Sequence, residues 1–78
     1  MAGKRSVEHY REHELVCEVS ASRDGWRYRV SIVGHHGDTS EVKCVASENA
    51  YNSDVEALRA AKIEGRRIID QRLEDSGT

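Results

Sequence analysis

The chain has 78 residues, close to the smallest size at which a protein builds its own hydrophobic core, and a single domain is therefore expected. Charged residues make up 33% and hydrophobic residues 37% of the sequence, and the formal net charge is -2. This balance excludes a protein that attracts polyanions as a whole, although a local basic patch stays open. A membrane-spanning segment and a signal peptide are not evident, so a cytoplasmic location is expected.

The first 14 residues are mostly charged or polar, and we expect them to form a flexible or partly helical N-terminal arm. Val7, Tyr10 and Arg11 have helical spacing, but so short a segment is not helical alone in water. Contacts with the rest of the protein would have to hold the arm in place.

Two strands are predicted next, because apolar and polar residues alternate with a period of two. The residues expected on the core face are Leu15, Cys17, Val19 and Ala21, followed by Trp26, Tyr28, Val30 and Ile32. Asp24-Gly25 is a preferred pair for a two-residue hairpin loop. With that loop, Val19 would face Val30 across the two strands.

A third strand is predicted from Thr39 to Ala46, with Val42 and Cys44 directed to the core. This orientation needs a loop of three or five residues after the second strand. Cys17 would then lie about twice the ~4.8 Å strand spacing from Cys44, and a disulfide needs Cα atoms within roughly 7 Å. Both cysteines are therefore expected to be reduced core residues.

A C-terminal helix is predicted to begin at Ser53-Asp54-Val55-Glu56, which matches a capping box, and to end near Leu73. Its apolar stripe is expected to contain Val55, Leu58, Ala61, Gly65, Ile68, Ile69 and Leu73. Gly65 is interpreted as a close approach to Trp26 and Tyr28. The predicted fold is α+β: a three-stranded antiparallel β-meander with one helix on one face, formed by residues 15–73, followed by a frayed tail of residues 74–78.

No catalytic, cofactor-binding or metal-binding residues are predicted. His9 and His13 would share one face of a helical arm, but no third ligand follows at a telling spacing, so a solvated pair is the preferred interpretation. His35 and His36 are expected to be exposed in a turn. Because the cysteines are expected to be buried and inert, with no histidine on their face, we do not expect an enzyme.

The outer face of the sheet is the surface through which we expect the protein to act. The residues assigned to this interaction surface are Val16, Arg27, Arg29, Val33, Lys43 and Val45. The favoured function is a small binding or interaction module, accessory or regulatory in role, with an unknown protein partner. Nucleic acid is disfavoured because the face lacks exposed aromatic residues.

Two alternatives stay open: a weak nucleic-acid-binding protein, and an enzyme or metal protein whose site is completed by oligomerisation. A monomer or a weak homodimer is expected.

The strand order and final helix resemble the β-β-β-α part of double-stranded-RNA-binding domains in topology. The start of the last helix is acidic here, at Asp54 and Glu56, where those domains carry lysines, so their RNA function is not implied. The run Trp26-Arg27-Tyr28-Arg29-Val30, Tyr51-x-Ser53 and the helix ending Arg67-Ile68-Ile69-Asp70 resemble small uncharacterised bacterial proteins. This resemblance implies the same layout and no particular activity.

Overall fold

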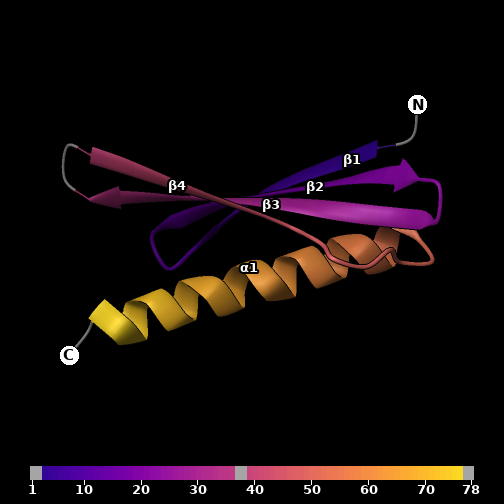
Figure 1. The fold of residues 1–78 in the computed structure, drawn as a ribbon. Coiled ribbons are helices and arrows are strands. Elements are labelled where there is room, and N and C mark those ends of the chain that lie inside the picture. Colours follow the sequence, from indigo (N-terminus) through magenta and orange to yellow (C-terminus); the bar gives the residue numbers. More distant parts are fainter. Residues whose placement is uncertain (1–2, 37–38, 77–78) are drawn as a thin grey trace.

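The computed structural model describes residues 3–36 and 39–76 of the chain. An antiparallel sheet with the strand order β1-β2-β3-β4 is covered on one face by a single helix (Figure 1). The elements are β1 (Gly3–Tyr10), β2 (His13–Ser22), β3 (Gly25–His36), β4 (Thr39–Ala46) and α1 (Asp54–Ser76). The predicted α+β class with a C-terminal helix is confirmed, but the described residues form four strands rather than three. No helix in these two ranges is long and apolar enough to cross a membrane.

Strand β1 occupies residues that were expected to form a flexible arm. Tyr10 pairs with His13, so Arg11 and Glu12 form a two-residue turn between β1 and β2. Their φ angles are 47° and 66°, and a type I′ turn requires positive φ at both positions. Such turns favour Asn-Gly, and Arg-Glu therefore carries no sequence signal for a hairpin.

Polar contacts hold β1 against the helix. The β1 residues on the helix side are Lys4, Ser6, Glu8 and Tyr10, which pair with the β2 residues on that side. Lys4 Nζ lies 2.8 Å from Asp54 Oδ2, and Arg66 Nη2 lies 2.9 Å from Glu8 Oε2. Because these contacts are polar, β1 lacks the apolar alternation by which a half-buried strand is recognised.

The hairpin of β2 and β3 keeps the predicted faces but shifts the predicted register by two residues. Val19 pairs with Tyr28 rather than Val30, and the turn is Arg23-Asp24. Gly25 has φ 140°, and a Cβ there would lie 2.5 Å from the Tyr51 carbonyl oxygen. Trp26 N donates a hydrogen bond to that same oxygen at 2.8 Å. Gly25 is therefore needed where the chain after β4 approaches β3, and it is not a loop residue.

Strand β4 presents the opposite face to the one predicted. Val30 pairs with Val45, which packs against the core, whereas Val42 and Cys44 are exposed on the other side of the sheet. His36 pairs with Thr39, so two residues separate the paired positions instead of three or five. The change from an odd to an even number reverses every side chain of the strand.

The hydrophobic core lies between β2, β3 and α1. Its buried residues are Leu15, Cys17, Val30, Ile32, Ala61, Ile68 and Ile69. The close approach predicted at Gly65 is confirmed, but its neighbour is Leu15 instead of Trp26 and Tyr28. A Cβ at Gly65 would lie 2.5 Å from Leu15 Cδ2.

The helix begins as predicted and differs in its buried stripe. The Glu56 backbone N–H donates a hydrogen bond to Ser53 Oγ at 3.1 Å, as expected of a serine N-cap. Ala57 is buried in the first turns, whereas Val55, which was expected in the stripe, is exposed. The helix continues to Ser76 rather than ending near Leu73, and the last two residues of the predicted frayed tail lie outside the described residues.

Candidate binding face of the sheet

The face of the sheet opposite α1 carries four valines, one on each strand, which we call the valine band. Val7 pairs with Val16, and Val33 pairs with Val42. Val16 lies opposite Ser31, two positions before Val33, so the two valine pairs adjoin diagonally across β2 and β3. Val7 is 49% and Val42 is 62% exposed. Since a solvated sheet face normally carries polar residues, the valine band is an apolar surface that no described element covers.

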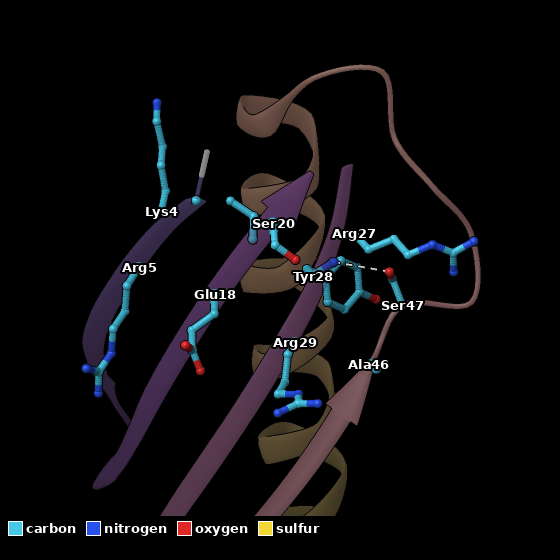
Figure 2. Close-up of a pocket in the computed structure, with 11 residues that line it drawn as sticks. Lys4, Arg5, Glu18, Ser20, Arg27, Tyr28, Arg29, Ala46 and Ser47 are labelled. Carbon is cyan, nitrogen blue, oxygen red and sulfur yellow. Dashed lines mark hydrogen bonds between the residues drawn. The ribbon is translucent and has the colours of Figure 1, made fainter. Parts of the chain in front are cut away.

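A charged hollow adjoins the valine band on the same face (Figure 2). Arg5, Glu18 and Arg29 are in register on three neighbouring strands, and the helix lies behind the sheet in this view. Together with Ser20 and Arg27 they line a hollow of about 800 Å³. Within residues 3–36 and 39–76, Arg5, Glu18 and Arg29 form no ion pair. Their charges are therefore available to a ligand.

Arg27 differs from these residues because its charge is matched at the rim of the hollow. Its Nη2 donates a hydrogen bond to Asp24 Oδ2 at 2.9 Å, and its Nη1 reaches the Glu48 carbonyl oxygen at 3.4 Å. The hydrogen bond from Arg27, followed by the one from Ser22, lowers the pKa of Asp24. Among the described residues, Arg5 and Arg29 are thus the guanidinium groups of the hollow that have no ion pair.

Four of the six residues assigned to the interaction surface lie on this outer face: Val16, Arg27, Arg29 and Val33. Lys43 and Val45 lie on the helix side instead, because β4 has the reversed orientation. The reversal adds Val42 and Cys44 to the outer face, and β1 adds Arg5 and Val7. If the loop between β3 and β4 is assumed to have two residues, the commonest hairpin length, the sequence predicts Val42 and Cys44 on the outer face.

The two cysteines have different surroundings. Both are free; Cys17 is buried and Cys44 is exposed, so the prediction that both are core residues is wrong for Cys44. Burial raises the pKa of the Cys17 thiol, and the nearby Glu8 carboxylate adds to the effect. Cys44 Sγ lies 3.5 Å from Ser31 Oγ on the outer face.

The histidines do not form the helical pair that was considered for a metal. His9 faces outward, 3.8 Å from Glu14, whereas His13 is buried on the helix side with its Nδ1 2.8 Å from the Arg11 carbonyl oxygen. His35 and His36 belong to β3 instead of a turn, and their side chains lie outside the described residues. The described part of the chain contains no group of three or more histidine, cysteine, aspartate or glutamate residues that could hold a metal ion.

Comparison with protein families, curated proteins and solved structures finds no match to this chain.

Proposed function

We propose that this protein is a binding module rather than an enzyme, and that its outer sheet face docks another protein. The observation that carries the proposal is the valine band, because it crosses the sheet from one edge strand to the other while α1 covers only the opposite face. Contiguous apolar surface rimmed by charges is typical of protein interaction sites.

The charged residues beside the valine band support a protein as the partner that binds this face. Arg5 and Arg29 place two cations beside the carboxylate of Glu18, and none of the three forms an ion pair within the part of the chain that the structure describes. Such alternating charges favour a partner whose surface charges are complementary, and they disfavour a partner whose surface carries charges of only one sign. The valine band would then supply buried apolar area, and the rim would supply the orientation.

Site-specific photo-crosslinking in an extract of the source cells tests this proposal. A photoreactive residue is placed at Val33 on the outer face or, as the matched control, at Ile63, which is 62% exposed on the helix. We expect a protein adduct from position 33 alone, and we expect Val16→Glu in the same chain to abolish it. Equal adducts at both positions, or no adduct at position 33, would contradict an outer-face binding role.

Nucleic-acid binding is the second candidate, and the free guanidinium groups of Arg5 and Arg29 in the hollow are the observation that favours it. Contacts of this kind give affinity that falls steeply with salt. Retention of duplex RNA or DNA at low salt, lost in Arg5→Ala and Arg29→Ala, would support this candidate. No retention even at low salt would eliminate it.

A further inference from the structure

We propose that the partner that docks on the outer sheet face is a second copy of this chain. In such a dimer the two sheets pack face to face and the two helices lie on the outside. The inference rests on the proposed function of the outer face and names its occupant.

The first argument is that the outer face is complementary to itself in charge. Glu18 on β2 and Arg29 on β3 lie opposite each other on the two central strands, yet they form no ion pair within their own described chain. A two-fold axis that runs parallel to the strands, between β2 and β3, exchanges these two strands. It therefore places Glu18 over Arg29 of the second copy and Arg29 over Glu18 of the second copy.

The charges also disfavour one alternative axis. An axis across the strands, over the row that contains Val16, would place Glu18 over Glu14 of the second copy. Facing carboxylates repel each other, and this arrangement is disfavoured. The axis parallel to the strands avoids that contact and forms two intermolecular ion pairs.

One apolar pair of the outer face fits the same arrangement. The other three valines of the band lie over Ser31, Glu14 and His9 of the second copy. Val7 and Cys44 lie on the two edge strands, in the row that joins them through Val16 and Ser31. Rotation about the axis parallel to the strands exchanges the edges, so Val7 lies over Cys44 of the second copy. Apolar groups near both edges would then be shielded from water.

The size of the face is adequate for a dimer. Four strands about 4.8 Å apart and eight residues long, at about 3.3 Å per residue, cover on the order of 500 Å² in projection. The accessible area exceeds the projection, because side chains stand up from the sheet. The face therefore approaches the roughly 800 Å² that each partner buries in an interface of standard size.

Sedimentation velocity with two charge-reversal variants tests the inference. Glu18→Arg would place two guanidinium groups together, the new one at position 18 and that of Arg29 in the other copy, and Arg29→Glu would place two carboxylates together. Each variant alone should therefore dimerise with a Kd raised about tenfold or more. Mixing the two variants should restore a species of twice the chain mass of 8.8 kDa, because the mixed dimer brings positions 18 and 29 of opposite charge together.

The mixing step separates the intermolecular contact from the contact within one chain. Residues 18 and 29 carry like charges within each variant chain, whether the variants are mixed or not, so only contact between copies can restore assembly. Arg59→Glu, an exposed change on the helix, is the matched control and should leave the dimer of the unmodified chain intact. Circular dichroism of each variant confirms that it folds.

The outcomes also distinguish this inference from the proposed function. A monomer at every concentration, or a dimer that the charge reversals do not affect, would overturn the second copy as occupant. If position 33 still gave an adduct with a different protein in extract, the outer face would remain a binding surface. If the dimer formed as described, the adduct at position 33 would contain a second copy of the chain.

Discussion

The Tyr10 hydroxyl donates a hydrogen bond to the Asp70 carboxylate at 2.8 Å, and this contact joins the end of β1 to the C-terminal half of α1. The Arg11 guanidinium binds the same carboxylate at 2.7 Å. The guanidinium of Arg66 lies 5.5 Å from the centre of the Tyr10 ring. These contacts hold the edge strand and its turn over the helix, and through them the outward-facing Val7 and Arg5 keep their places on the sheet.

Removing either partner of this contact should loosen β1. Tyr10→Phe and Asp70→Asn should each lower the midpoint of urea unfolding, because each removes or weakens a hydrogen bond that spans the two elements. The double variant should lose less stability than the two single losses combined, since both changes remove one shared contact. Purely additive losses would contradict a direct contact between Tyr10 and Asp70.

The same carboxylate predicts a loss of stability in acid. Hydrogen bonds from Arg11 and then Tyr10 lower the pKa of Asp70 below its ordinary value of 3.8. The folded state therefore binds this proton less tightly than the unfolded state does. Its stabilising contribution is complete above the unfolded pKa and is lost as the pH falls through the folded pKa.

Urea unfolding of the protein and of Asp70→Asn from neutral pH into acid measures this contribution. The stability difference between the two should be constant near neutral pH and should shrink in acid. A difference that stays the same at every pH would show that Asp70 acts through packing instead of charge.

The turn between β1 and β2 predicts a stabilising substitution. Glu12 has φ 66°, a conformation that costs a residue with a side chain about 1–2 kcal/mol and costs glycine little. Glu12→Gly should therefore raise the free energy of unfolding by about 0.5–1 kcal/mol, after allowance for the greater freedom of glycine in the unfolded chain. Thermal or urea unfolding measures the change, and a clear loss of stability would contradict the type I′ turn.

Gly65 predicts a coupled pair of substitutions. Alanine at this position would gain about 1 kcal/mol of helix propensity, but its Cβ would overlap Leu15 Cδ2 in a buried site. We expect Gly65→Ala to cost about 1–2 kcal/mol overall, because overpacking outweighs propensity. In a Leu15→Val background, which lacks the Cδ atoms, the same change should become neutral or stabilising. Equal costs in both backgrounds would contradict the contact with Leu15.

The parts of the fold that could be predicted are those in which apolar alternation and local capping agree. Leu15, Cys17, Val30 and Ile32 alternate with polar residues, and all four are buried as predicted. Ser53 accepts a hydrogen bond from the Glu56 backbone N–H at the predicted start of the helix. In both cases the signal lies within a few residues of sequence.

The parts that could not be predicted depend on contacts between distant residues. β1 is held by the pairs Lys4–Asp54 and Glu8–Arg66, and side chains of this type are typical of exposed segments. The orientation of β4 depends on the number of residues between the paired His36 and Thr39, and a difference of one residue reverses both faces. The sequence therefore predicts only Val16 and Val33 of the valine band on the outer face, because Val7 and Val42 lie on these two strands.

Alkylation of Cys44 as a function of protein concentration tests most directly whether the outer sheet face is covered by a second copy. Cys44 is exposed on that face, and the buried Cys17 in the same chain reports any unfolding. The dimer predicts that the rate of Cys44 alkylation falls as concentration rises and that Glu18→Arg shifts this protection to concentrations about tenfold higher or more, with Cys17 unreactive throughout. A Cys44 rate that is the same across the whole soluble concentration range would contradict it.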